Sequence, residues 1–136
     1  MADISVTAAN VGLAENGVGT RQVQVGETVT QGEPLYLKTS DNKYWLADAD
    51  VAASAVVAGI ALTPAAADGY VVMATSGAVD VGGTLTVGET YIVSATAGGI
   101  APIGDLSSSD YLSILGVATA TDTLDINLYI SGVAKP

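Results

Sequence analysis

The stretch VQVGETVTQGEPLYL at residues 23–37 returns in altered form as VDVGGTLTVGETYIV at residues 79–93. Aligned without a gap, the two share Val, Gly, Thr and Glu at the same positions, namely Val23, Val25, Gly26, Thr28, Thr30, Gly32 and Glu33 against Val79, Val81, Gly82, Thr84, Thr86, Gly88 and Glu89. Alternating Val and Thr favour β-strands, and glycine supplies the positive φ or close backbone approach that turns need. The repetition predicts two similar β-modules within one chain.

The similarity continues downstream of both stretches. Each is followed by a loop with acidic residues and then by a strand that a glycine interrupts, AVVAGIAL with Gly59 and LSILGVAT with Gly116. Gly59 is a candidate β-bulge. The pseudo-repeats therefore cover about residues 21–62 and 77–119. One module of this size buries too little apolar area alone, so we expect the two to close on each other.

Short runs rich in Val, Ile, Thr and Tyr recur between Gly, Asn, Asp and Pro, and they predict strands at 4–8, 21–25, 34–39, 43–47, 55–62, 70–75, 77–81, 89–95, 111–120 and 124–131. Ser40-Asp41-Asn42 is the expected hairpin turn. Segment 48–59 allows one turn of helix, and 14–21 and 96–110 are expected loops. We therefore expect one all-β domain over residues 1–136, a small antiparallel β-barrel or sandwich built from two pseudo-repeated β-modules with at most one short helix.

The chain is poor in charge and strongly acidic. Charged residues make up 13% of the chain, about half the usual share of roughly 25%. A surface poor in charge tends to be covered by subunits or partners. Asp and Glu number 14 against 4 Lys and Arg, which gives a net charge of −10. This charge repels nucleic-acid phosphates and anionic membranes, so neither nucleic acid nor membrane is an expected partner.

The sequence has no His and no Cys. These absences exclude Ser-His-Asp and Cys-His catalytic sites, disulfides and the usual zinc sites. The glycines also lack the spacing of a nucleotide-binding loop. We therefore expect a protein that is not an enzyme and that uses no cofactor and no metal.

The amino-terminal MADISVTAAN lacks the basic start and the apolar core of a secretion signal. The longest apolar run, VAASAVVAGIAL at 51–62, is shorter than the about 20 residues that cross a bilayer. The sequence therefore favours a soluble protein made in the cytoplasm.

Two carboxylates offer the main alternative chemistry. In an extended segment Asp48 and Asp50 would lie on one side, about 6.7 Å apart, a spacing that suits an acid–base pair acting on a sugar. Tyr44 and Trp45 would then form a stacking platform for that sugar. The same two carboxylates could instead bind calcium. An ordinary solvated acidic loop is the favoured interpretation.

Tyr44 and Trp45 are neighbours in a predicted strand, so their side chains point to opposite faces. One of the two is expected in the core and the other outside it. An outward Trp45 would be an interface anchor, although a core position is the favoured interpretation.

An ordered set of motifs spans roughly residues 20–132: V-x-x-G-E-x-V-x-x-G-x-x-L-Y-L-K-T-S-D-N-K, then A-D-A-D, V-V-A-G-I-A-L, G-x-L-x-x-G-E-x-Y and a closing G-V-A. This set resembles the small capsid decoration (cement) proteins of tailed bacteriophages. The resemblance implies a β-rich homotrimer on the outer surface of the virion capsid. There it would bridge neighbouring major capsid proteins of an expanded shell and resist the pressure of packaged DNA. It implies no catalytic residue.

Two other functions stay open at this point. Related β-modules occur in phage tail and fibre proteins, so a structural module of such a protein is the first alternative. A carbohydrate-binding module is the second, and it would need exposed aromatic side chains along a groove. The aromatic content of 5% argues against it.

The segment from Ala2 to Leu13 lies outside the repeat and alternates apolar and polar residues. Such a segment can act as an arm that adds a strand to a neighbour's sheet. An ordinary first strand of the barrel explains the pattern equally well. The capsid or subunit interface expected from this reasoning comprises Ala2, Asp3, Ile4, Ser5, Val6 and Trp45.

Overall fold

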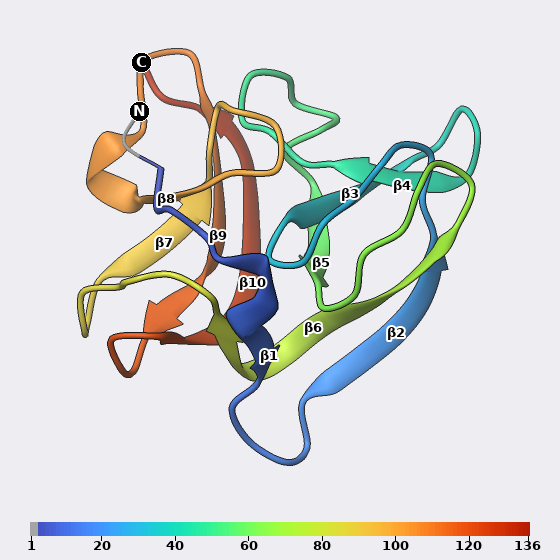
Figure 1. The fold of residues 1–136 in the computed structure, drawn as a ribbon. Helices are drawn as coiled ribbons and strands as arrows, with labels where there is room; N and C mark the ends of the chain where they lie inside the picture. The colour runs from blue at the N-terminus through green and yellow to red at the C-terminus, as the bar shows by residue number, and fades with distance from the viewer. Residues whose placement is uncertain (1–2) are drawn as a thin grey trace.

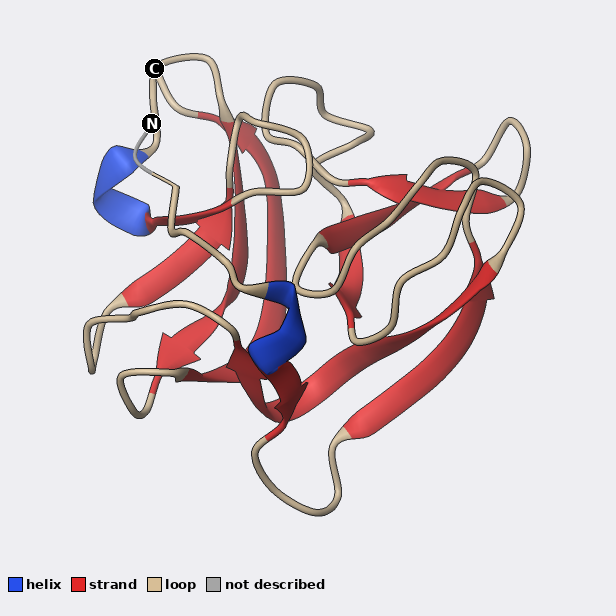
Figure 2. Ribbon diagram, in the orientation of Figure 1, coloured by secondary structure: helices blue, strands red, loops and turns tan. Residues whose placement is uncertain are grey.

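The computed structural model describes residues 3–136 and is built almost entirely from β-structure, with 49% of residues in strands and no α-helix in that range. Two 3₁₀ turns, η1 (Ala8–Asn10) and η2 (Ile103–Asp105), interrupt it (Figure 2). The strands are β1 (Val11–Leu13), β2 (Gly19–Gln24), β3 (Pro34–Lys38), β4 (Lys43–Leu46), β5 (Val57–Ala61), β6 (Tyr70–Val81), β7 (Thr90–Val93), β8 (Ile100–Pro102), β9 (Tyr111–Ala118) and β10 (Thr123–Ala134). They form one curled antiparallel sheet, a half-barrel, which confirms the predicted all-β class.

Strand β6 is the strand that joins the two parts of this sheet. The hydrogen-bonded order is β4-β3-β5-β6-β10-β9-β7-β8, and both β1 and β2 also pair with β6. The beginning of β6 pairs with β2 and β5, whereas its end pairs with β1 and β10 (Figure 1). The sequence predicted two strands here, at 70–75 and 77–81. The structure has one, because Gly77 adopts a φ of 94° and redirects the strand without ending it.

The same pairing order occurs on each side of Gly77. In the N-terminal half (residues 19–75), β3 pairs with β4 and β5, and β5 pairs with β6. In the C-terminal half (residues 76–134), β7 pairs with β8 and β9, and β9 pairs with β10. The hydrogen bonds around the repeated Gly-Glu turns also match: Gly32 N–H donates to Ala61 O at 2.8 Å, and Gly88 N–H donates to Ala118 O at 2.8 Å.

The glycines that interrupt β5 and β9 mark matching irregularities. Gly59 lies opposite Leu35 and Gly116 lies opposite Tyr91, and in both ladders the register shifts directly after that pair. The bulge predicted at Gly59 is therefore confirmed, and the C-terminal half has its counterpart. Both glycines lie on strands flanked by neighbours on either side, so the bulges bend the interior of the sheet rather than its edge.

The largest core cluster draws on both halves. It includes Ile60 and Ala74 from the N-terminal half and Leu115 and Leu124 from the C-terminal half, all fully buried. A smaller cluster around Val25 and the side chain of Leu35 fills the N-terminal half alone. Because the main cluster is shared, neither half can lose its packing without exposing apolar surface of the other.

We therefore expect the two halves to unfold together. Trp45 is the sole Trp of the chain and lies in β4, so its fluorescence reports on the N-terminal half, while far-ultraviolet circular dichroism reports on all strands. The shared core predicts that both signals follow one transition in urea with the same midpoint. A fluorescence midpoint clearly separated from the dichroism midpoint would contradict this expectation.

Two local predictions need correction. Residues 4–7 form no strand, because Ile4 N–H and Thr7 N–H donate to carbonyls at two separate places and no continuous ladder results. The predicted loop 96–110 contains β8 and η2. Segment 48–59, where the sequence allowed one turn of helix, forms a turn that Ala55 N–H closes by donating to Val51 O at 3.1 Å, after which β5 begins. The hairpin turn at Asp41-Asn42 is confirmed, with Asn42 at a φ of 60°.

Candidate functional site

The N-terminal segment, defined here as residues 3–7, lies on the C-terminal half of the sheet. Ile4 N–H donates to Ile100 O in β8 at 2.8 Å, and Thr7 N–H donates to Gly82 O, just after β6, at 2.7 Å. The Ile4 side chain packs against the main core cluster. The segment thus spans the space between the end of β6 and the edge strand β8 and contributes one side chain to the core.

A side-chain hydrogen bond fixes the first described residue. The Asp3 carboxylate accepts a hydrogen bond from the Ser94 hydroxyl, and Ser94 is fully buried. A hydrogen bond from a hydroxyl to a charged acceptor is stronger than one between neutral groups. The contact therefore anchors the segment at its start, next to the turn that joins β7 to β8.

The expected interface residues divide between the interior and the surface. Ile4 faces the core, whereas Ser5 and Val6 are exposed, with Val6 at 36%. The two apolar residues Ile4 and Val6 therefore do not share a face, and the alternation in the sequence does not correspond to a strand. Ala2, also expected at the interface, lies outside the described residues.

Trp45 takes the outward position of its pair and Tyr44 the inward one. Tyr44 is 7% exposed within the N-terminal core cluster, while Trp45 is half-buried on the other face of β4. The prediction that the two residues face opposite sides is confirmed, and the favoured core position for Trp45 is wrong. The indole covers Gly26, where a side chain would collide with the ring.

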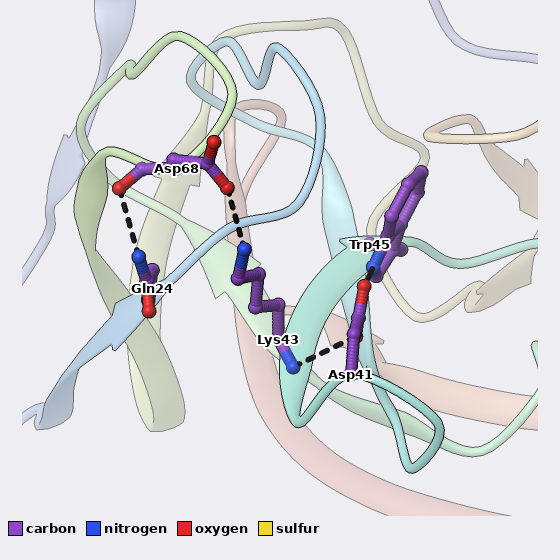
Figure 3. A network of polar contacts seen from close by, with 5 residues as sticks. All are labelled: Gln24, Asp41, Lys43, Trp45 and Asp68. Atoms are coloured by element: carbon purple, nitrogen blue, oxygen red, sulfur yellow. Dashed lines mark hydrogen bonds and ion pairs between the residues drawn. The ribbon is translucent and has the colours of Figure 1, made fainter.

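Polar neighbours hold the Trp45 ring in place. Its Nε1–H donates to Asp41 Oδ2 at 3.0 Å, and Lys38 Nζ lies 4.3 Å from the ring centroid, in cation–π geometry. Lys43 N–H also donates to Asp41, and Lys43 Nζ pairs with Asp68 Oδ1 at 2.6 Å (Figure 3). The arrangement presents a fixed aromatic surface beside two of the few basic residues of the chain.

The carboxyl group of Asp41 has a pKa below its ordinary value. Desolvation acts to raise this pKa, but the hydrogen bonds from Lys43 N–H and Trp45 Nε1–H, with the charges of Lys38 and Lys43, outweigh it. A depressed pKa means that the contacts persist at and above the ordinary pKa and are lost as the pH falls through the lower, folded-state value.

We therefore expect the Trp45 emission to change with a midpoint below pH about 3.9, the ordinary value for Asp. The measurement is a fluorescence titration from neutral to acidic pH under conditions where circular dichroism shows the fold intact. Asp41→Asn is the control, because it removes the titrating group and should abolish the change. A midpoint at or above the ordinary value would show that the hydrogen bond is absent in solution.

The two structural elements of the expected interface are separate. In Figure 1 the N-terminal segment runs past β8, to which Ile4 is hydrogen-bonded, whereas β4 lies on the opposite side of the view. The segment contacts Gly82 and Gly99, and Trp45 contacts Gly26. The structure therefore does not bring the expected interface residues into one patch.

The Asp48 and Asp50 pair does not have the extended geometry that a sugar acid–base pair would need. Asp50 N–H donates to Asp48 Oδ1 at 3.1 Å, so the two residues form a turn. The pKa of Asp50 is raised, first by desolvation and then by the charges of Asp48 and Asp110. Across residues 3–136, no group of three or more His, Cys, Asp or Glu side chains is arranged to hold a metal ion.

Sequence reasoning missed the residues that receive the N-terminal segment, namely Gly82, Gly83, Ser94, Gly99 and Ile100. Most of them act through a backbone carbonyl or through the absence of a side chain, and neither feature gives a specific sequence signal. The repeat did contain one usable signal. The repeat offset is the number of residues from Gly26 to Gly82. Adding this offset to the residue numbers of β4 gives residues 99–102, and β8 lies there.

Comparison with known proteins gives no assignment. No protein-family model matches the chain, and a search of curated proteins finds no match. Among the described residues, no helix has the length and apolar character that a membrane crossing requires.

Proposed function

We propose that this protein is a structural component of a tailed-phage virion that binds the outer surface of the expanded capsid and bridges major capsid proteins. The ordered motif set between residues 20 and 132 carries the proposal. The all-β body agrees with it, since the resemblance implies a β-rich fold.

The exposed apolar side chains also support a role in assembly. Tyr70, Val87, Tyr129 and Val133 are each at least 58% exposed, in a chain whose charged fraction is 13%. Exposed large apolar side chains mark partner sites where they lie together, and two of these, Tyr129 and Val133, belong to the same strand, β10. A role in which part of the surface contacts other subunits would account for both features.

The proposed mechanism is multivalent. A homotrimer that touches several capsid subunits at once gains effective concentration at each further contact, so weak individual contacts suffice. If the trimer binds the expanded shell and not its precursor, it stabilises the expanded state by mass action. The net charge of −10 keeps free copies apart until they meet that surface.

The deciding experiment is a copy count. Purified virions from the source of this sequence are digested, and the chain is quantified against the major capsid protein by mass spectrometry with labelled peptide standards. A decoration role predicts copies on the order of the number of capsid subunits, since one trimer serves each local three-fold position. A few copies per particle would instead assign the chain to the tail or a fibre, and none would remove it from the virion.

A further inference from the structure

The two halves differ at one matched position. In the N-terminal half, Gly26 N–H donates directly to Tyr44 O at 2.9 Å, and a parallel bridge joins Val25 to Tyr44. This contact closes the space between the end of β2 and the edge strand β4. The N-terminal half therefore closes with its own strands.

In the C-terminal half the corresponding residues are Gly82 and Ile100. Tyr44 lies opposite Leu37 in its hairpin, and Ile100 lies opposite Val93 in the same register. Here the N-terminal segment stands between the two residues: Ile100 O accepts from Ile4 N–H, and Gly82 O accepts from Thr7 N–H. The C-terminal half thus closes only with the help of an inserted segment.

The space that holds this segment, which we call the slot, is shaped for a peptide backbone. A Cβ on Gly82 would lie 2.5 Å from Thr7 O, and a Cβ on Gly83 would lie 2.5 Å from Ser5 O. A Cβ on Gly99 would collide with the Asp3 carboxylate. Glycine at 82 and 83, where the collision is with backbone carbonyls, is therefore required for the segment to fit, whereas at Gly99 the colliding carboxylate is the end of a flexible side chain that can move aside.

The slot also selects the sequence of its occupant at two points. The buried Ser94 hydroxyl donates to the carboxylate of Asp3, and the main core cluster receives the side chain of Ile4. Between the two outer hydrogen bonds, Ser5 and Val6 are exposed, and the Val6 side chain also lies against Gly32. The recognised feature is an extended backbone that carries an acidic residue followed by a branched apolar residue.

No strand is disrupted when the segment leaves the slot. Residues 3–7 belong to no strand of the sheet, and η1, which joins them to β1, has no buried residue. Every copy of the protein carries the same segment and the same slot. Exchange of an identical terminal element between copies preserves each contact and changes only the connection.

We propose that the slot between Gly82 and Ile100 is a segment-accepting site and that it takes residues 3–7 of a second copy of this chain, so that copies are linked by exchanged N-terminal segments. This inference is independent of the capsid role, since it follows from the closure of the C-terminal half. The net charge of −10 opposes the approach of two copies, so exchange should increase with protein concentration and with salt, which screens that repulsion.

The test mixes two single-cysteine forms of the full chain, Asp3→Cys and Ser94→Cys. The chain has no other Cys, and neither form can make a disulfide within one copy. A disulfide between position 3 and position 94 therefore requires the segment of one copy in the slot of another. The mixture is oxidised in a glutathione buffer, and the linked peptides are identified by mass spectrometry after digestion.

We expect the 3–94 adduct to exceed, by at least about tenfold, the adduct formed when Ser40→Cys replaces Ser94→Cys. Ser40 is an exposed serine at the β3–β4 hairpin, so it measures random collision. Adding Gly83→Ala to the Ser94→Cys form should suppress the adduct, because the new Cβ fills the slot. Gly12→Ala should not, since no atom lies within 4 Å of a Cβ at that position.

A 3–94 adduct no more abundant than the Ser40 background, at high protein concentration and high salt, would overturn the proposal. If Ser94→Cys fails to fold by circular dichroism, Gly99→Cys serves as the acceptor, because its side chain would also meet residue 3. With this acceptor the proposal is overturned by two results together: no adduct between positions 3 and 99, and only monomeric product when the Asp3→Cys/Gly99→Cys double variant is oxidised.

Discussion

Replacing Gly116 with alanine is expected to lower the free energy of unfolding by about 3 kcal/mol or more, at the upper end of overpacking effects. A Cβ at this position would overlap the backbone carbonyl of Asp125 in the neighbouring strand β10. A backbone atom inside a paired ladder cannot move aside as a flexible side chain can. The bulge at Gly116 would have to open, and with it the pairing of β9 to both β7 and β10.

Gly59→Ala should have a similar effect in the other half, because its Cβ would overlap the carbonyl of Ala74 in β6. The matched control is Gly104→Ala in η2, where no atom lies within 4 Å of an added Cβ. That change should be neutral or slightly stabilising, since alanine restricts the unfolded chain. Urea denaturation of the three variants gives the comparison. Equal midpoints for Gly116→Ala and Gly104→Ala would show that the tight bulge is not present in solution.

Strand positions could be predicted from the sequence because hydrophobic alternation and turn residues are local signals. The Asp41-Asn42 turn and the bulge at Gly59 were predicted in this way, and both are present. Strand β8 was missed because Ile100–Pro102 is short and lies among Gly, Pro and Ser. It is a strand because it pairs with β7, in the same register in which β4 pairs with β3 in the N-terminal half.

The position of the N-terminal segment could not be predicted for a different reason. Its fixed contacts are mostly with backbone atoms, the carbonyls of Ile100 and Gly82, and a carbonyl carries no residue-specific signature. Alternation in the sequence would place Ile4 and Val6 on one face of a strand. Ile4 instead packs against the core, whereas Val6 is exposed and lies against Gly32, because the segment bends between two anchoring points rather than following a ladder.

Removing residues 1–7 is expected to lower the free energy of unfolding by about 2 kcal/mol and to abolish binding to expanded capsids. The stability loss follows from withdrawing the partly buried Ile4 side chain from the core and from losing the hydrogen bonds that Asp3, Ile4 and Thr7 make with the C-terminal half. The truncated chain should keep its strand signal by circular dichroism, since every strand begins at or after Val11. Binding should be lost because the segment is the expected contact with the shell.

Two single substitutions separate these effects, because they alter opposite sides of the same segment. Ile4→Ala removes the inward side chain and should reduce stability, whereas Val6→Ser changes an exposed side chain and should leave the urea midpoint within error. If the outward face of the segment contacts the capsid, Val6→Ser weakens sedimentation with expanded shells while stability is unchanged. The opposite result is that Ile4→Ala weakens binding only in proportion to the unfolded fraction and that Val6→Ser has no effect on binding. The segment would then serve the fold alone, and the contact with the shell would lie elsewhere. The surface around the half-buried Trp45 is the next one to alter.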